Sequence, residues 1–67
     1  QPLRIRFDIQ SSVEQTFKIF SEVEVKTFTV NPGRAWYEVV LDNPQMAYNF
    51  SADTADIELF QYELIPQ

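Results

Sequence analysis

Apolar and polar residues alternate position by position through much of this chain, and this pattern limits its fold more than any other feature. The first stretch is unbroken, with Leu3, Ile5, Phe7 and Ile9 on odd positions and Arg4, Arg6, Asp8 and Gln10 on even ones. A period of two places alternate side chains on opposite faces of a β-strand. The segment therefore predicts a strand with one buried face and one solvent-facing face, as is typical of antiparallel sheets.

The same alternation resumes after a polar break at residues 10–12. Apolar residues again take odd positions at Val13, Phe17, Ile19, Val23 and Val25. A short helix over residues 12–20 is the alternative, because Ser12 and Gln15 fit a capping box and Val13, Phe17 and Phe20 recur at helical spacing. The β-branched and aromatic content favours strands.

Beyond residue 26 the parity of the apolar positions changes, which predicts a β-bulge or a strand break between Lys26 and Phe28.

A turn is expected at residues 31–34, where Pro32 presets φ and Gly33 accepts the positive φ of a type II turn, joining two antiparallel strands. A second turn is expected at residues 42–45. The further strands predicted are 35–41, a short one over 46–50, and a final one from about residue 57 to 64, after a polar connection at 51–56.

Strands separated by frequent turns predict an all-β fold. We expect a small antiparallel β-sandwich or partly open barrel of about 5–6 strands, with the short helix near residues 12–20 as the open alternative. At 67 residues the chain should form a single small β domain over residues 1–67.

The absence of cysteine and histidine removes several function classes. Disulfides cannot form, and a zinc or other transition-metal site has no preferred ligands. Catalysis would depend on carboxylate pairs such as Asp53 with Asp56, or Asp56 with Glu58, in a chain with little room for a cleft. The same acidic segment lacks the glycine and the regular carboxylate spacing of calcium loops. We therefore expect no enzyme activity, no metal and no cofactor.

Charge divides the sequence into two parts. All five basic residues lie in the first 34 positions, whereas the last 33 contain six carboxylates and no cation, and the net charge is −5. Binding to nucleic acid requires a basic face, so direct nucleic-acid binding is not expected. Anionic membranes would also be repelled, and no apolar run is long enough to span a bilayer. A partner protein with a basic surface is compatible with this charge.

Trp36 and Val40 lie on one face of the predicted strand 35–41, opposite Tyr37, Val39 and Leu41. A strand that is apolar on both faces needs cover on both. One cover is the core of the domain, and the other is either a second layer of a closed sandwich or a partner. Trp is also a common anchor of protein interfaces.

These features predict a non-enzymatic protein-protein interaction module, acting as an accessory subunit of a larger assembly or as a modulator of its partner. Binding would use an aromatic β-surface with an acidic surround, and self-association stays open. The expected protein-binding residues are Trp36, Glu38, Val40, Asp53, Asp56 and Glu58.

An alternative is an acidic inhibitor that mimics nucleic acid and occupies a basic site on an enzyme. This function needs spaced carboxylates on one face, for which the candidates are Glu38, Asp53, Asp56, Glu58 and Glu63.

A scattered set of residues provides a further comparison: Arg6, Phe7, Asp8, Pro32, Gly33, Tyr48, Asn49, Phe50, Ser51, Ala55 and Gln61. Their order resembles the soluble domain of the copper-delivery assembly factors of cytochrome c oxidase. The resemblance implies an immunoglobulin-like β-sandwich. In that family a Cys-Phe-Cys-Phe run follows the glutamine and carries copper, whereas this chain has Tyr62, Glu63, Leu64 and Ile65 there. The resemblance therefore implies the fold of a divergent relative without its copper site.

Overall fold

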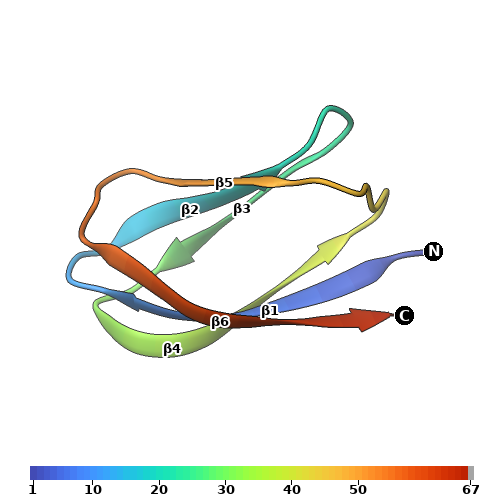
Figure 1. Cartoon of the computed structure of the whole chain (residues 1–67). Coiled ribbons are helices and arrows are strands. Elements are labelled where there is room, and N and C mark those ends of the chain that lie inside the picture. The colour runs from blue at the N-terminus through green and yellow to red at the C-terminus, as the bar shows by residue number, and fades with distance from the viewer. Residues whose placement is uncertain (67) are drawn as a thin grey trace.

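The computed structural model describes residues 1–66, which form six β-strands and no helix (Figure 1). No segment in this range is thus a helix that could cross a membrane. The strands are β1 (Leu3–Ser11), β2 (Gln15–Phe20), β3 (Val25–Val30), β4 (Gly33–Leu41), β5 (Asn49–Ala52) and β6 (Ile57–Pro66).

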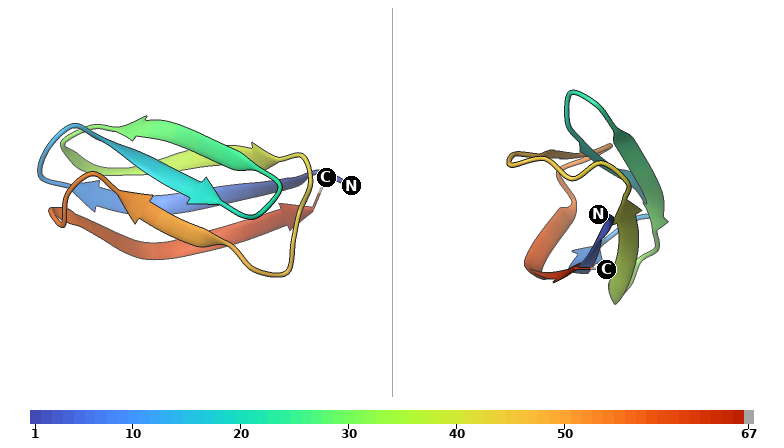
Figure 2. Two further views of the ribbon diagram at one scale, coloured as in Figure 1. Left: turned by 90° about the horizontal axis from the view of Figure 1, so that it is seen from above. Right: turned by 90° about the vertical axis from the view of Figure 1, so that its right-hand side faces the viewer.

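The strands form two antiparallel three-stranded sheets that pack face to face as a small β-sandwich. Sheet A has the order β4-β1-β6, and sheet B has the order β3-β2-β5. Only β2 and β3 are joined as a hairpin within one sheet, so every other connection passes from one sheet to the other. Figure 2 shows β3 and β4 side by side at one edge, while β5 and β6 diverge at the other. The prediction of an all-β sandwich is confirmed.

Residues 12–20 do not form the alternative helix. Gln15, which would have taken part in a helix cap, is almost fully buried at the start of β2. Its side-chain amide donates to Ser11 Oγ at 3.0 Å, and its carbonyl oxygen accepts the Thr54 N–H at 2.9 Å. These bonds tie the β1–β2 and β5–β6 connections together and close this end of the sandwich.

The prediction of a bulge or a strand break between Lys26 and Phe28 is wrong, because β3 runs through these residues and pairs with β2 in one uninterrupted register. The inward-facing positions change from odd in β2 to even in β3 across the turn at residues 21–24, and Val25, still on an odd position, is 60% exposed on the solvent face of β3. The sheets contain a register shift elsewhere, in β6, where Asp8 pairs with Gln61 and Ile9 pairs with Leu59. Phe60 is therefore the extra residue of a bulge.

The chain bends at Pro32 within the turn expected at residues 31–34, but Arg34 already belongs to β4, and the two strands that are joined are not paired with each other. Gly33 has a φ of 108°, a conformation that a residue with a side chain rarely adopts. The Asn31 N–H donates to the hydroxyl of Tyr37 at 2.9 Å and so fixes the crossing. The chain thus passes from β3 in sheet B to β4 in sheet A, which explains why these two strands lie together at one edge of the sandwich. We call this edge the closed edge.

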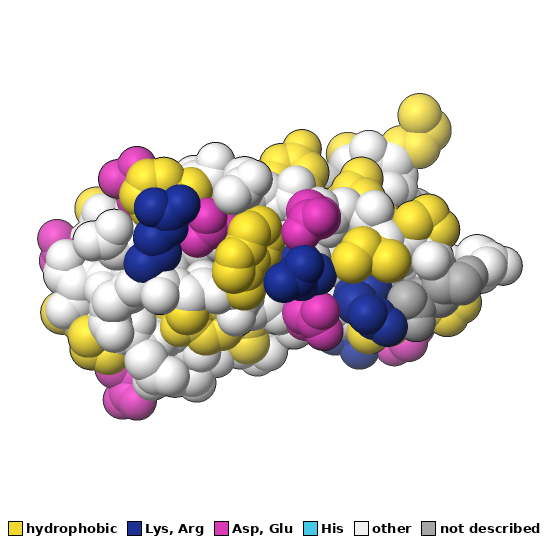
Figure 3. All heavy atoms as spheres, turned by 90° about the horizontal axis from the view of Figure 1, so that it is seen from below, with side chains coloured by type: hydrophobic (Ala, Val, Ile, Leu, Met, Phe, Trp, Pro, Cys, Tyr) yellow, Lys and Arg dark blue, Asp and Glu magenta, His cyan; other side chains and the backbone are white. Residues whose placement is uncertain are grey.

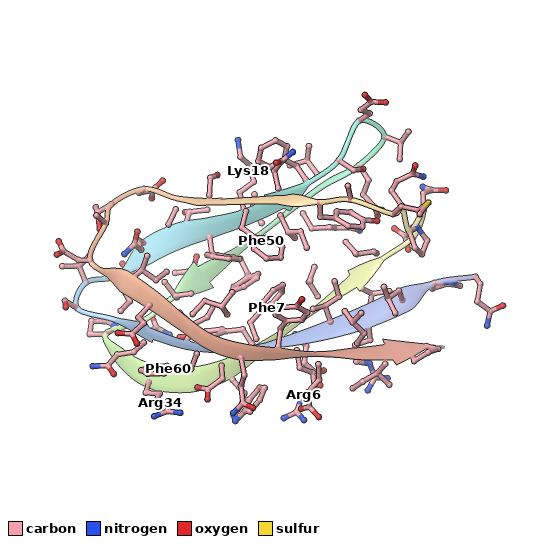
Figure 4. All side chains as sticks on the ribbon, in the orientation of Figure 1. Arg6, Phe7, Lys18, Arg34, Phe50 and Phe60 are labelled. Atoms are coloured by element: carbon pink, nitrogen blue, oxygen red, sulfur yellow. The ribbon has the colours of Figure 1, made fainter. Side chains whose placement is uncertain are left out.

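Phe7, in the middle strand of sheet A, is the centre of the core. Its ring is fully buried and contacts the rings of Phe17, Phe28 and Phe50, at centroid distances of 5.5, 5.9 and 5.5 Å. Phe7 and Phe50 point toward each other between the sheets in Figure 4. The core as a whole consists of Ile5, Phe7, Ile9, Phe17, Ile19, Val30 and Leu41.

We predict that Phe7→Ala lowers the free energy of unfolding by about 3–5 kcal/mol, because the cavity removes contacts on both sheets at once. A domain of this size has only a few kcal/mol to lose, so the variant should be largely unfolded at room temperature. Urea denaturation followed by far-UV circular dichroism measures this. Phe20→Ala is the matched control, since Phe20 lies on the solvent face of β2, and its loss should cost no more than about 1 kcal/mol. Equal losses in the two variants would contradict a core centred on Phe7.

Candidate functional site

The solvent face of sheet A contains four of the six expected binding residues: Trp36, Glu38 and Val40 from β4 and Glu58 from β6. Trp36 lies outside the sandwich and is 40% exposed, so it is not a core residue of a closed structure. Figure 3 shows this face, on which basic, acidic and hydrophobic side chains are interspersed. The face is not uniformly acidic, because it combines three arginines with four carboxylates: Arg4, Arg6, Arg34, Asp8, Glu38, Glu58 and Glu63.

Arg6 connects the two halves of the sequence on this face. It lies between Glu38 of β4 and Glu63 of β6, with Nε 3.3 Å from Glu38 Oε1 and Nη1 3.0 Å from Glu63 Oε1. Its guanidinium also stacks on the Trp36 ring, with Cζ 4.7 Å from the centroid. Two of the expected binding residues, Trp36 and Glu38, therefore already have partners within the chain.

Arg34, a second arginine on this face, binds the buried carboxylate of Asp8. Arg34 Nε and Nη2 donate to the two oxygens of Asp8 at 3.0 and 2.8 Å, and Gln61 Nε2 donates to Asp8 at 3.2 Å. Phe60, the bulge residue, lies under the guanidinium, with its centroid 4.0 Å from Cζ. The Arg34 hydrogen bonds hold the pKa of Asp8 below its ordinary value, although desolvation of this carboxyl opposes them. Asp8 is 3% exposed, so the arrangement stabilises the fold and presents no free carboxylate.

Asp53 and Asp56 lie apart from the other expected binding residues, in the β5–β6 connection. Asp53 Oδ2 accepts the Thr16 N–H at 3.0 Å. The main-chain carbonyl of Asp56 accepts the Ser12 N–H at 3.0 Å. No group of side chains suited to holding a metal ion occurs in this connection or elsewhere in the described chain. The structure therefore does not gather the six residues into one site.

A different surface leaves core-facing side chains uncovered, along the edge where β5 and β6 diverge. Tyr62 and Leu64 of β6 pair with the buried residues Phe7 and Ile5 and so point toward the sandwich interior, yet they are 55% and 57% exposed. Phe50 of β5 also points inward and is 42% exposed. We call this surface the open flank and define it by Met46, Tyr48, Phe50, Tyr62 and Leu64.

The open flank contains a cavity of about 290 Å³ between the sheets. Leu3, Ile5 and Ile19 form its floor, and the flank residues form its sides. Among residues 1–66 no charged side chain lines it, and its polar side-chain groups are those of Gln45, Tyr48 and Tyr62. Such a surface can take up apolar side chains, with a few hydrogen-bonding groups to orient them.

The flank is open because β5 is too short to cover β6. The sequence predicts this strand from residue 46, but β5 begins only at Asn49, and Met46 lies in the connection, fully exposed. Local hydrogen bonds keep the preceding segment out of the sheet. The Tyr48 hydroxyl accepts the Gln45 N–H at 2.8 Å, and the Glu24 carboxylate accepts the N–H groups of Asp42 and Asn43 at 2.7 and 3.0 Å. The second half of β6 thus has no strand facing it in sheet B.

Sequence reasoning missed the open flank, although two signals point to it. The first is the change of parity at Phe60: Ile57 and Leu59 are apolar on odd positions, whereas Tyr62 and Leu64 are apolar on even ones. The second is Pro44 in the turn expected at residues 42–45, because its missing N–H disfavours a strand that extends back from residue 46 to cover β6. Neither signal shows by itself which strand would face β6.

Comparisons with known proteins give no match to a family model, a curated protein or a solved structure. The likeness to the copper-delivery factors gains no support from them, and residues 62–65, which replace the copper-binding run, lie within β6. The function must be inferred from the surfaces described above.

We predict that Asp8→Asn lowers the melting temperature near neutral pH and flattens its dependence on pH. The pKa of Asp8 is lowered in the folded state, so its contribution to stability is present above the ordinary carboxyl pKa and is lost as the pH falls below about 4. Melting curves between about pH 7 and pH 2 test this. The exposed Glu14→Gln, which removes the same charge from a connection, is the control. Parallel pH profiles for the wild type and Asp8→Asn would contradict this role.

Proposed function

We propose that this chain is a non-enzymatic protein-binding module, an accessory subunit or modulator of another protein, and that the open flank is its main contact surface. The observation that carries the proposal is the exposure of Phe50, Tyr62 and Leu64, whose side chains point into the sandwich. Side chains in this position belong to a core that the chain leaves incomplete.

The extent of the exposed apolar side chains supports the proposal. Phe50, Tyr62, Leu64 and Met46 are all between 42% and 105% exposed, and a group of exposed apolar side chains often marks an interaction site on a small monomer. Covering such surface is worth about 25 cal/mol per Å² before the costs of association. A domain of 67 residues buries a small core, so the gain from completing it with a partner is comparatively large.

The Trp36 face is the weaker candidate surface. Trp36 is stacked on Arg6, and Glu38 is ion-paired with the same arginine, so a partner would have to compete with contacts inside the chain. This face could extend a contact made at the flank, because β6 belongs to both surfaces.

The acidic-inhibitor alternative receives less support from the arrangement of carboxylates. Glu38 and Glu63 share Arg6 as an ion-pair partner, which offsets part of their charge. The other three candidates lie away from the open flank, near the end of the sandwich where the β1–β2 and β5–β6 connections meet: Asp53, Asp56 and Glu58. The salt dependence of the affinity distinguishes the two functions. Binding by charge mimicry weakens steeply as the ionic strength rises, whereas the affinity of an apolar contact changes little.

Affinity capture from the native source, followed by reconstitution with the purified partner, tests the proposal. We expect Leu64→Asp to weaken the reconstituted complex at least tenfold, because a carboxylate would have to be desolvated in the apolar flank. Val23→Asp is the matched control: Val23 is also 57% exposed but lies in the β2–β3 turn. Its complex should match that of the wild type.

Trp36→Ala distinguishes the two surfaces in the same assay. The proposal predicts a change of less than about threefold for this variant. A complex that Trp36→Ala abolishes and Leu64→Asp leaves intact would move the binding surface to the solvent face of sheet A. A native source that yields no partner able to bind the purified chain would overturn the protein-binding function.

A further inference from the structure

We infer that the occupant of the open flank is an extended segment of a partner protein that pairs with the outer edge of β6 and has an apolar-basic-apolar sequence. The inference rests on the proposed function and specifies its partner. In this arrangement the two apolar side chains lie beside Tyr62 and Leu64, and the basic side chain lies beside Glu63.

The outer edge of β6 is available for pairing. β6 is an edge strand of sheet A, and β1 is its one strand partner among the described residues. An edge strand presents unpaired backbone N–H and C=O groups, to which an extended peptide can add. The bulge at Phe60 and the missing N–H of Pro66 limit this edge at either end. A partner strand therefore has a window of residues 61–65.

The side chains in this window set the pattern that a partner needs. Tyr62 and Leu64 point toward the cavity, while Glu63 points to the solvent face of sheet A. Residues directly opposite each other on neighbouring strands have their side chains on the same face. A strand beside β6 would thus place two alternate side chains over the cavity and the one between them on the solvent face. The first two should be apolar and the third polar.

Charge complementarity makes the middle residue basic. Glu63 lies at the centre of the window, and its single ion pair within the described chain is with Arg6 on the side of β1. No cation lines the cavity, and the hollow beside it, which shares Gln45 and Met46, is lined by the acidic Glu22. The chain as a whole has a net charge of −5. A lysine or arginine opposite Glu63 would gain a cross-strand ion pair and would also be attracted by the overall charge.

A second copy of the chain fits this edge less well. A two-fold antiparallel pairing that used the whole window would be centred on residue 63 and would set Glu63 opposite its own copy. Like charges directly opposite on neighbouring strands are destabilising. A basic strand from another protein avoids this repulsion.

Selection from a displayed library of random twelve-residue peptides tests the inference, with the Leu64→Asp variant used to remove peptides that bind elsewhere. We expect the enriched peptides to alternate apolar and polar residues, with Lys or Arg between two apolar positions. Synthetic versions should bind the wild type at least tenfold more tightly than Leu64→Asp. Hydrogen exchange of the bound chain should slow at amides within residues 61–65. Val23→Asp should bind as the wild type does.

Glu63→Gln tests the charge component separately. Arg6 retains Glu38 in this variant, so the sheet should stay folded, and circular dichroism checks this. A peptide with a central Lys should lose most of its advantage over the same peptide with Gln, while the apolar requirement remains. Equal discrimination by wild type and Glu63→Gln would overturn the basic position.

Three further outcomes would overturn the inference. The first is enrichment of helical or acidic peptides, or of none, and the second is unchanged hydrogen exchange along β6. The third is a concentration-dependent dimer in sedimentation equilibrium that Leu64→Asp abolishes, which would assign the flank to a second copy. If a purified native partner still lost affinity for Leu64→Asp, the protein-binding function would stand while the strand-pairing inference failed.

Discussion

The contact of the Phe7 ring with the aromatic rings of the opposite sheet is the interaction on which this structure depends. Phe7 lies in the central strand of sheet A, and the rings that surround it come from all three strands of sheet B. The packing continues toward the closed edge, where Phe28 stacks on Tyr37 at a centroid distance of 5.3 Å. Toward the other edge it ends at Phe50. The open flank begins where this cluster stops, so the same packing that joins the sheets also determines which side chains stay uncovered.

The division of charge along the sequence disappears when the strands pair. β1 comes from the basic part of the chain and lies between β4 and β6, which supply most of the acidic part of sheet A. Arg6 therefore meets Glu38 and Glu63, and Lys26 of β3 meets Asp42 at 3.0 Å. The sequence pattern suggested an acidic half that would face a partner. The structure instead shows internal neutralisation across strands, which leaves the apolar flank as the more distinctive surface.

Local alternation was sufficient to predict the fold but not the site. The pattern from Leu3 to Ile9 predicted β1, and Gly33 predicted the turn after β3 with its positive φ. The helix alternative at residues 12–20 failed because the Gln15 side chain bonds both to the neighbouring Ser11 and to Thr54 of the distant β5–β6 connection, and the second contact is not visible in any local pattern. The expected binding residues lie on separate surfaces for a similar reason. The sequence shows which side chains of a strand share a face, but whether a side chain is buried depends on which strand of the other sheet lies opposite. β5 stops short of covering Leu64 because loop hydrogen bonds made by Tyr48 and Glu24 hold the residues before it out of the sheet.

The sandwich is closed along β3 and β4 and open along β5 and β6, so that Leu64 points inward and is still 57% exposed. Solvent paramagnetic relaxation of side-chain methyl groups, measured by NMR with a soluble gadolinium chelate, tests this most directly. Leu59 and Leu64 belong to the same strand and the same inward face, so they form an internal comparison. We expect strong relaxation of the Leu64 methyls, similar to that of the Val23 methyls, and weak relaxation of the Leu59 methyls. Equal protection of Leu59 and Leu64 in the isolated monomer would contradict it.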